Sequence, residues 1–425
     1  RSDTPSPPVD PVDAIADLAD ATGLRRVHVL AWRDLDDPEA GGSEIHIDRV
    51  AAHWAKAGVE VTMRTSAASG QPEVARRNGY RAIRRSGRHS VFLTAAAAEL
   101  AGRHGPRDGL IEIWNGMPFG SPIWARGPRV VFLHHLHGVM WNGAFPSHPR
   151  LAQLGQFMEH HIAPVAYRRV PIVTLSTSSR DELVDELGFA PDRVSVVPPG
   201  ISERYRPGRP AAADPTVLVV TRLMPSKRVD HVVRSVAELR HRVPDVRVEV
   251  VGSGRELAAL EELTRRLGVT DAVSFLGRVS DDELLDAYGR AWVVASASLR
   301  EGWGMTLTEA AATGTPAVAT DIPGHRDAVD DQVSGLLVPE DQPLTEALHY
   351  NHREASEGGP ITFTDSLGRS GGCQGCHPAH RSDGDLSGYP IDLDGNNYYA
   401  NSDTRDANGG CFVGRDVHSN PKKDI

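Results

Sequence analysis

The chain has 425 residues, a formal net charge of −10, and the apolar and charged fractions of an ordinary soluble protein. Its length allows two or three domains with sizeable cores, and its acidic balance argues against nucleic acid as a partner. No apolar run reaches the roughly 18 residues of a membrane span, and the first residues lack a signal-peptide pattern.

Residues 1–23 are predicted to form an N-terminal extension whose Pro-rich start is disordered. The chain then alternates short apolar runs with helical patterns, such as the spacing of Ile47, Ala51 and Trp54. Another helix is expected to begin near Ser179. The runs predicted as strands in this half are 25–32, 59–65, 90–95, 109–115, 129–135, 171–177 and 193–200.

A Pro- and Gly-rich stretch, 198–215, is predicted to link this half to a second series of strands and helices. Strand–helix alternation predicts an α/β fold with parallel sheets. We expect two Rossmann-like domains, 24–198 and 199–348, that face each other across a cleft, with ligands at the carboxyl ends of the strands. The predicted strands of the second series are 216–222, 246–252, 272–277, 291–298 and 315–321.

The composition changes sharply after residue 348, which marks a module boundary. Residues 1–348 hold no cysteine, and Lys56 and Lys227 are their only lysines. Residues 349–425 hold all three cysteines and are rich in Gly, Asp and Asn. We therefore treat 349–425 as a separate, irregular tail that is either native to the body or fused to it.

Two polar clusters follow predicted strands in the first half. Gly41 and Gly42 precede a helix that Ser43 is expected to cap, so their backbone N–H groups could bind an anion, although a plain tight turn is equally consistent. His134 follows a strand, and a histidine there can contact a ligand or be a satisfied polar group. A zinc site with His135 and His137 is a weaker alternative, because no carboxylate or cysteine stands at metal-ligand spacing.

In the second half too, charged residues and glycines follow predicted strands. Arg222 and Lys227 lie after its first strand, and two cations five residues apart suit a diphosphate. Lysine is so scarce in this body that Lys227 indicates a need for a compact charge, although a solvated basic loop is the common alternative. Gly252 begins a Gly-Ser-Gly sequence, which alone is a weak nucleotide signal.

Glu301 and Glu309 stand eight residues apart around two glycines, before and within a short Ala-rich helix. Glycine allows a ligand to approach the backbone, and a helix start offers free N–H groups. Without context, the pair is a loop carboxylate and a helix carboxylate. In order with the Gly-Gly, His-His, Arg-x4-Lys and Gly-Ser-Gly elements, it resembles the E-x7-E motif of retaining glycosyltransferases with the GT-B fold, family 4.

The resemblance, over about 320 residues, implies transfer of a hexose from a UDP-, GDP- or ADP-sugar to a hydroxyl of a glycan, lipid or small molecule. It implies that His134, Arg222, Lys227 and Glu301 are the catalytic residues. A nucleotide-sugar epimerase or a sugar-binding module on the same fold remains an alternative. No Asp-x-Asp motif stands in the expected place, so no catalytic metal is expected.

The resemblance also assigns the donor contacts. Glu301 is expected beside the sugar, and Glu309 is expected to accept hydrogen bonds from the ribose hydroxyls. Arg222 and Lys227 would bind the diphosphate. The remaining donor-binding residues would be Gly41, Gly42, Gly252, Arg278, Val279, Gly302, Trp303, Gly304 and Met305.

The sequence departs from the family after residue 348, where the usual final helices are not recognisable. The tail instead holds Cys373-x-x-Cys376-His377, which is the attachment signature of c-type haem. Both cysteines would bind the porphyrin covalently and His377 would be an axial iron ligand, as in multihaem cytochromes. The tail has no methionine, so the second ligand would be one of the histidines at 349, 352, 380 and 418.

Alternatives for the tail are a Cys373–Cys376 disulfide, or a zinc site made by these cysteines with His377 and Cys411. Nucleotide sugars indicate a cytoplasmic location, with peripheral association at a membrane surface left open. Covalent haem would instead indicate export. A cytochrome electron-transfer protein that carries an inactive glycosyltransferase-like body is therefore the competing hypothesis.

Overall fold

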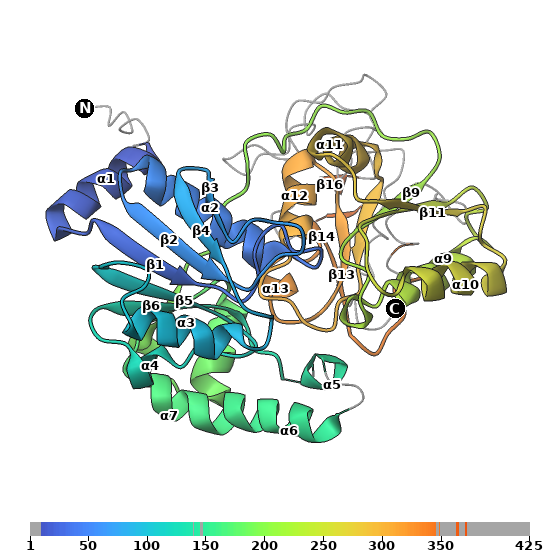
Figure 1. The fold of residues 1–425 in the computed structure, drawn as a ribbon. Coiled ribbons are helices and arrows are strands. Elements are labelled where there is room, and N and C mark those ends of the chain that lie inside the picture. The colour runs from blue at the N-terminus through green and yellow to red at the C-terminus, as the bar shows by residue number, and fades with distance from the viewer. Residues whose placement is uncertain are drawn as a thin grey trace, which may run out of the picture. The chain divides into compact units, whose positions relative to one another are not determined.

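The structure is a computed structural model that describes residues 10–138, 140–144, 148–345 and 348, together with two short pairs, 363–364 and 370–371. The chain divides between Pro199 and Gly200 into two compact units. Each unit has a twisted, mainly parallel sheet covered by helices on both faces (Figure 1). Among the described residues, no helix is long and apolar enough to cross a membrane.

The first unit has eight strands in the order β3-β4-β2-β1-β5-β6-β7-β8, and only the β3–β4 pair is antiparallel. Its strands are β1 (Arg26–Leu30), β2 (Glu60–Thr65), β3 (Val74–Arg77), β4 (Tyr80–Arg84), β5 (Gly109–Asn115), β6 (Arg129–His135), β7 (Ile172–Thr174) and β8 (Val194–Val196). Its helices are α1 (Pro11–Thr22), α2 (Gly42–Lys56), α3 (Val91–Leu100), α4 (Ser121–Trp124), α5 (Met140–Ala144), α6 (Pro149–Phe157), η1 (Met158–Ile162), α7 (Ala163–Tyr167), α8 (Thr177–Asp181), η2 (Glu182–Glu186) and η3 (Pro191–Arg193).

Alternate residues of the central strand β1 pack into different cores, as expected for a strand covered on both faces. Val27 and Val29 belong to the core beneath α2, whereas Leu30 packs with Val91 and Ala95 of α3. Figure 1 shows α1 and α2 on one face of this sheet and α3, α4, α6 and α7 on the other.

The second unit has six parallel strands in the order β11-β10-β9-β12-β13-β14. Its strands are β9 (Thr216–Val220), β10 (Arg247–Val251), β11 (Val273–Gly277), β12 (Val293–Ser296), β13 (Ala317–Thr320) and β14 (Gly335–Val338). Its helices are η4 (Pro225–Lys227), α9 (Val229–Leu239), α10 (Leu257–Leu267), α11 (Asp281–Arg290), α12 (Met305–Thr313) and α13 (His325–Ala328). A further pair, β15 (Phe363–Thr364) and β16 (Ser370–Gly371), is antiparallel.

Numbered within the unit, the strand order of this sheet is 3-2-1-4-5-6. That order reverses direction between β9 and β12, and open parallel sheets bind ligands at such a point, outside the carboxyl ends of the strands. Helices α9 and α10 cover one face, and α11 and α12 cover the other. The predicted α/β fold with two Rossmann-like domains is therefore confirmed.

Three local features differ from the sequence-based expectations or add to them. Residues 90–95 were expected to be a strand, but Ser90 is the N-cap of α3 and the helix begins at Val91 and continues through an alanine-rich stretch. Pro11–Thr22, within the expected extension, is helix α1; Asp10 caps it by accepting a hydrogen bond from the Val12 N–H at 2.8 Å. The β3–β4 hairpin, which adds an edge to the first sheet, was also not expected.

Candidate active site

The loops after β9 and β12 meet at the reversal point of the second sheet. Lys227 ends the short helix η4 after β9, and Glu301 lies in the loop after β12. The Nζ atom of Lys227 donates to Oε1 of Glu301, and both side chains are largely buried, with 14% and 23% of their surface exposed. A Lys–Glu pair thus occupies the position where this fold binds ligands.

Ser298 also holds the Glu301 carboxylate, and Thr320 in turn holds Ser298. Ser298 donates its hydroxyl to Oε1 of Glu301 at 2.9 Å, and Thr320, at the end of β13, donates to the Ser298 carbonyl at 2.7 Å. Burial alone would raise the pKa of Glu301, but the charge of Lys227, the nearby His325 and the hydrogen bonds from Lys227 and Ser298 outweigh it and lower the pKa. Glu301 is therefore a carboxylate at neutral pH.

His325, the first residue of α13, is a buried part of this region that the sequence analysis missed. Its Nδ1 lies 2.8 Å from the Thr320 carbonyl oxygen, and its Nε2 lies 3.3 Å from Ser296 Oγ. Burial lowers its pKa, although the Glu301 carboxylate opposes the shift. No local motif marks this histidine; only the adjacency of β12 and β13 brings it close.

Glycines allow the loop from Glu301 to Gly304 to pack tightly. A Cβ atom on Gly324 would lie 2.5 Å from the Glu301 carbonyl oxygen, and the φ angle of Gly324 is +86°. Gly304 caps α12 at a φ of +103°, and Met305 is the first residue of that helix. The indole Nε1 of Trp303 is buried without a hydrogen-bond partner among the described residues, so a donor in this loop remains for a ligand.

Glu309 lies one turn further along α12 and is buried. Its Oε2 accepts a hydrogen bond from the Tyr288 hydroxyl at 2.9 Å. Burial and the neighbouring Glu309 charge raise the pKa of Tyr288 well above its ordinary value, so the hydroxyl stays protonated and donates. The tyrosine, which the sequence analysis did not identify, holds the Glu309 carboxylate in place.

The other predicted residues of this unit surround the same edge of the sheet. Arg222 lies in the loop after β9, and Arg278, after β11, places its Nε 3.3 Å from Ser253 Oγ in the loop after β10. Val279 packs on the core beneath α11 and α12. Gly252 has a structural reason to be glycine, because a Cβ atom there would lie 1.8 Å from the Thr221 carbonyl oxygen.

In the first unit, the start of α2 contacts residues at the ends of two neighbouring strands. Asn115 at the end of β5 donates its amide to Ser43 Oγ at 2.9 Å. His134 near the end of β6 places Nε2 3.2 Å from Nδ1 of His46. Polar side chains therefore gather at the carboxyl edge of this sheet too, on both sides of its own reversal point between β1 and β5.

The Gly-Gly loop is organised differently from the expectation. Gly41, not Ser43, precedes the first helical residue of α2. The Gly41 N–H, which was expected to bind an anion, donates to Oε2 of Glu44 at 2.8 Å. Glu44 also accepts from Ser43 Oγ at 2.9 Å and from Arg33 Nε at 3.2 Å, so a buried carboxylate fixes this loop.

His134 is buried, and its Nδ1 has no hydrogen-bond partner among the described residues. Burial, and to a smaller extent His46, lowers the pKa of His134 to about 3, so its ring is neutral and can exchange hydrogen bonds with a hydroxyl. His135 and His137 stack on each other with centroids 5.1 Å apart. Glu159 of η1 holds this loop by accepting the backbone N–H groups of His137 and Gly138, each at 2.8 Å.

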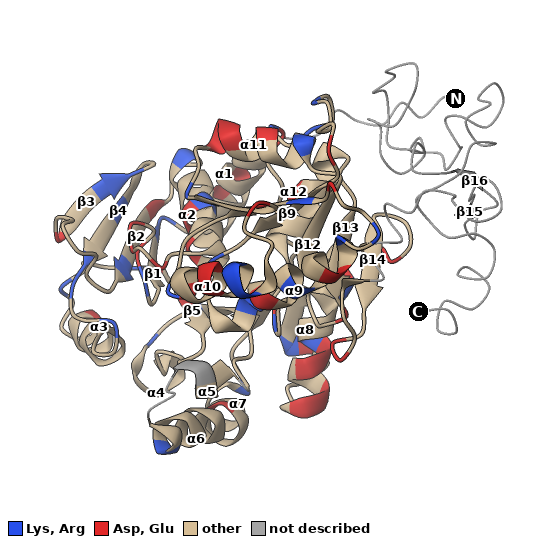
Figure 2. Ribbon diagram, turned by 90° about the vertical axis from the view of Figure 1, so that its right-hand side faces the viewer, with Lys and Arg blue, Asp and Glu red and all other residues tan. Residues whose placement is uncertain are grey.

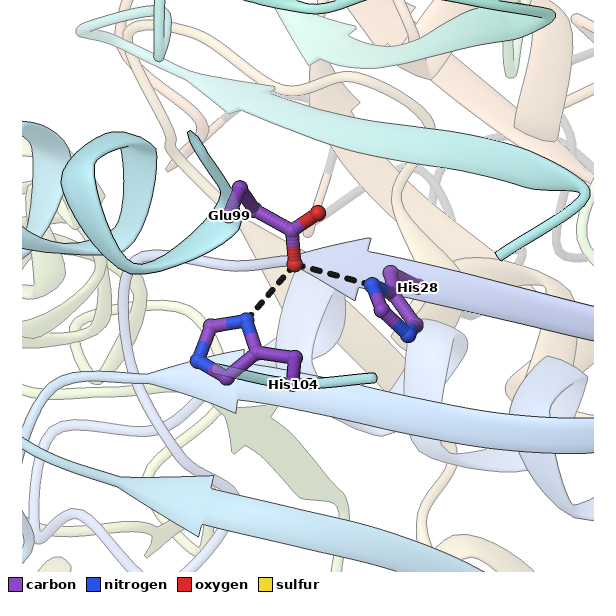
Figure 3. Close-up of side chains that lie close together, drawn as sticks. All are labelled: His28, Glu99 and His104. Atoms are coloured by element: carbon purple, nitrogen blue, oxygen red, sulfur yellow. Dashed lines mark hydrogen bonds and ion pairs between the residues drawn. The ribbon is translucent and has the colours of Figure 1, made fainter. Parts of the chain in front are cut away.

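Away from this edge, His28, Glu99 and His104 form a buried cluster (Figure 3). Both histidines place Nδ1 near the same oxygen of Glu99, at 2.9 and 2.6 Å, and Arg107 donates to the other oxygen at 2.9 Å. Among the described residues, this is the one group of three His, Cys, Asp or Glu side chains that lie close enough together to bind a metal ion. Each carboxylate oxygen already has a donor and an arginine neutralises its charge, so we interpret the cluster as a structural tie between β1, α3 and the following loop.

The predicted haem residues Cys373, Cys376 and His377 lie outside the residues that the structure describes. The same holds for the suggested second ligands and for Cys411.

Comparison with protein families gives two adjoining matches. Residues 40–205 match the model described as Glycosyltransferase Family 4, and residues 203–350 match the model described as Glycosyl transferases group 1. The D-inositol 3-phosphate glycosyltransferase of Saccharomonospora viridis is 31% identical over 361 residues, which cover 74% of this chain and 82% of the relative.

Other relatives match over a shorter stretch. The D-inositol 3-phosphate glycosyltransferase of Nocardia farcinica is 41% identical over 174 residues, or 37% of this chain and 39% of the relative. The chain thus spans about two fifths of that relative and of its Rhodococcus jostii counterpart.

Solved structures share the fold at low sequence identity. Sucrose-phosphate synthase from Thermosynechococcus elongatus has a TM-score of 0.65 at 20% identity, covering 76% of this chain and 89% of that one. HepE from Anabaena, in complex with UDP and glucose, has a TM-score of 0.59 at 17% identity, covering 77% and 90%.

Proposed function

The chain belongs to the group 1, family 4 glycosyltransferases, and we propose that it moves a hexose from a nucleotide-diphosphate sugar to an acceptor hydroxyl with retention of configuration. The observation that carries the proposal is the contact between Lys227 and Glu301 at the reversal point of the second sheet. This contact brings a cation suited to a diphosphate next to a carboxylate suited to sugar hydroxyls.

Lys227 and Arg222 would bind the donor diphosphate. An ammonium group has three donors. Within the described part of the chain, Lys227 gives one of them to Glu301, which leaves two for phosphate oxygens. Charge on the diphosphate grows as its bond to the sugar breaks. Cations held in place before the reaction stabilise that charge without reorganising.

Glu301 would accept hydrogen bonds from the sugar rather than donate a proton. Its lowered pKa keeps it ionised, and an ionised carboxylate only accepts. The unpartnered Trp303 indole N–H supplies a donor from the same loop. Glu309, oriented by Tyr288, would accept from the ribose hydroxyls.

The acceptor would be bound by the first unit, where His134 and Asn115 offer neutral hydrogen-bonding groups. The acceptor oxygen would form its bond to the anomeric carbon on the face that the diphosphate leaves. The departing phosphate oxygen would take the acceptor proton, so no enzyme nucleophile is required. We expect no catalytic divalent ion in this scheme.

The relatives and neighbours indicate which substrates to test first. HepE is described with UDP and glucose, and the relatives are named for D-inositol 3-phosphate. We therefore propose UDP-glucose and related UDP-, GDP- and ADP-sugars as donors, and a phosphorylated polyol as the first acceptor.

The test is a panel of these donors with and without the acceptor, followed by measurement of the released nucleotide diphosphate and NMR of the product. Acceptor-dependent release and a product with the donor's anomeric configuration support the proposal. Conversion of the donor sugar without any acceptor would favour an epimerase, and binding without turnover would favour a sugar-binding module.

A further inference from the structure

Helices α6, η1 and α7 follow one another without a break from Pro149 to Tyr167 and carry apolar residues on both sides. The inner side is buried and includes Ala152, Ala163 and Tyr167. Large apolar side chains gathered on the exposed outer side would mark a surface that binds another molecule.

The outer side exposes large apolar side chains that would ordinarily be buried. We call them the outer apolar row: Leu151, Leu154, Phe157, Ile162 and Val165, each 44–66% exposed. Spacings of three residues group Leu151, Leu154 and Phe157, and likewise Ile162 and Val165. The five-residue step between the two groups crosses the π-helix η1, whose wider i→i+5 turn brings them to the same side. Ile123 of α4, which packs on α7, is 78% exposed.

The charges around the outer apolar row have one sign. Arg150, Arg168 and Arg169 are exposed at the two ends of this helical stretch. Its one carboxylate, Glu159, is 1% exposed and holds the backbone N–H groups of His137 and Gly138. Figure 2 shows α6 and α7 mainly tan with blue, and the acidic turns of η2 follow only after β7 and α8.

We propose that the outer apolar row and its three arginines form a docking surface for an anionic lipid bilayer. Apolar side chains flanked by arginine are the pattern of a helix that lies in the headgroup region of a membrane. Anionic lipid attracts each nearby arginine, whereas a symmetric second copy would place like charges together. The surface lies in the first unit and uses none of the residues proposed to bind the donor.

The experiment is flotation of the full chain with vesicles of phosphatidylcholine alone and of phosphatidylcholine mixed with phosphatidylglycerol. We expect binding to the anionic vesicles at low salt, weaker binding as salt rises, and little binding to phosphatidylcholine alone. Leu154→Glu with Phe157→Glu should abolish binding. Replacing Arg150, Arg168 and Arg169 with glutamine should weaken it by more than about tenfold, since each arginine near an anionic surface contributes about fivefold.

Matched controls are Leu18→Glu, at an exposed apolar residue of α1, and Arg265→Gln with Arg266→Gln on α10. Both controls should bind like the unchanged chain. Circular dichroism checks that all variants fold, and turnover with a water-soluble acceptor should be unchanged, which separates this proposal from the proposed function.

Unaltered vesicle binding by the Leu154→Glu/Phe157→Glu variant would overturn the assignment. So would a chain that ignores anionic vesicles but forms a dimer, by light scattering, that the same variant dissociates. That second result would assign the outer apolar row to another copy of the chain.

Discussion

Lys227 and Glu301 come from loops 74 residues apart, and their contact depends on the adjacency of β9 and β12. The residue types and their order along the chain could be predicted from the sequence. Their pairing could not be predicted, because the spacing of residues along the chain does not reveal the order of strands in a sheet. The same reason explains why Tyr288 and His325 were missed, since each approaches a predicted residue only through the folded sheet. Ser298 stands only three residues before Glu301, but a serine in a loop carries no local signal of the carboxylate that it contacts.

Substitution of either cation should remove most turnover. Lys227→Ala and Arg222→Ala should each lower kcat by about 10²–10³-fold, the usual cost of losing one group that stabilises transition-state charge. The measurement is steady-state kinetics with the best donor of the panel. Lys56→Ala, the other lysine of the body and exposed on α2, is the control and should retain full activity. Full activity in both cation variants would refute the assignment.

Ser298→Ala should move the acidic limb of the pH profile to higher pH. Ser298 donates to the ionised form of Glu301, so its removal raises the pKa of that carboxyl. Since we propose that the ionised form binds the sugar, activity should fall as the pH drops through this pKa. The measurement is kcat/KM against pH, with Thr264→Ala on α10 as a hydroxyl-deletion control. If the acidic limb of the pH profile stayed at the same pH, the titration of Glu301 would not be what sets it.

At the scale of elements, apolar periodicity predicted most strands and the helix α2 but misassigned α3. The run from Ser90 to Ala95 contains Val, Phe and Thr, which favour strands, but the alanines up to residue 98 extend it as a helix. In the structure, Val91 and Ala95 face the core one turn apart, whereas Leu93 is exposed. A window that included residues 96–100 would have shown this helical spacing.

Glu99, near the end of α3, should be important for stability. Glu99→Gln leaves His28, His104 and Arg107 around an amide instead of a carboxylate, and loss of one partner from a buried ionic cluster costs about 3–5 kcal/mol. The measurement is thermal or urea unfolding at pH 7. Glu73→Gln, which breaks an exposed pair with Arg85, should cost no more than about 1 kcal/mol.

The same carboxylate gives the fold a defined acid sensitivity. Although burial opposes it, hydrogen bonds from His104 and His28 hold the pKa of Glu99 far below its ordinary value. A lowered folded-state pKa contributes stability that is present above the unfolded pKa of about 4.3 and is lost as the pH falls below it. The loss of stability between pH 6 and pH 3 should therefore be smaller in Glu99→Gln than in the unchanged chain. Equal losses would contradict this role.

At the scale of the whole molecule, the sequence predicts two different chemistries, and the family matches cover only one of them. The body from residue 40 to residue 350 is covered by the two family matches, whereas the haem motif lies at 373–377, beyond them. The body needs nucleotide sugars, which are made in the cytoplasm, and haem attachment through cysteines takes place outside it. The body could transfer sugars and the tail could carry haem in the same molecule only if the tail reached the haem-attachment machinery.

Covalent haem can be tested without knowing the substrate. If haem is attached at Cys373 and Cys376, its two thioether bonds would survive denaturation, so the denatured mass should rise by one haem and the sample should show a Soret band. The host must supply haem-attachment machinery, and Cys373→Ser with Cys376→Ser is the control, which should lose both signals. A bare polypeptide mass from that host would rule out the haem assignment and leave a disulfide or zinc for these cysteines. The glycosyltransferase proposal would stand in either case, because its residues all lie before position 310.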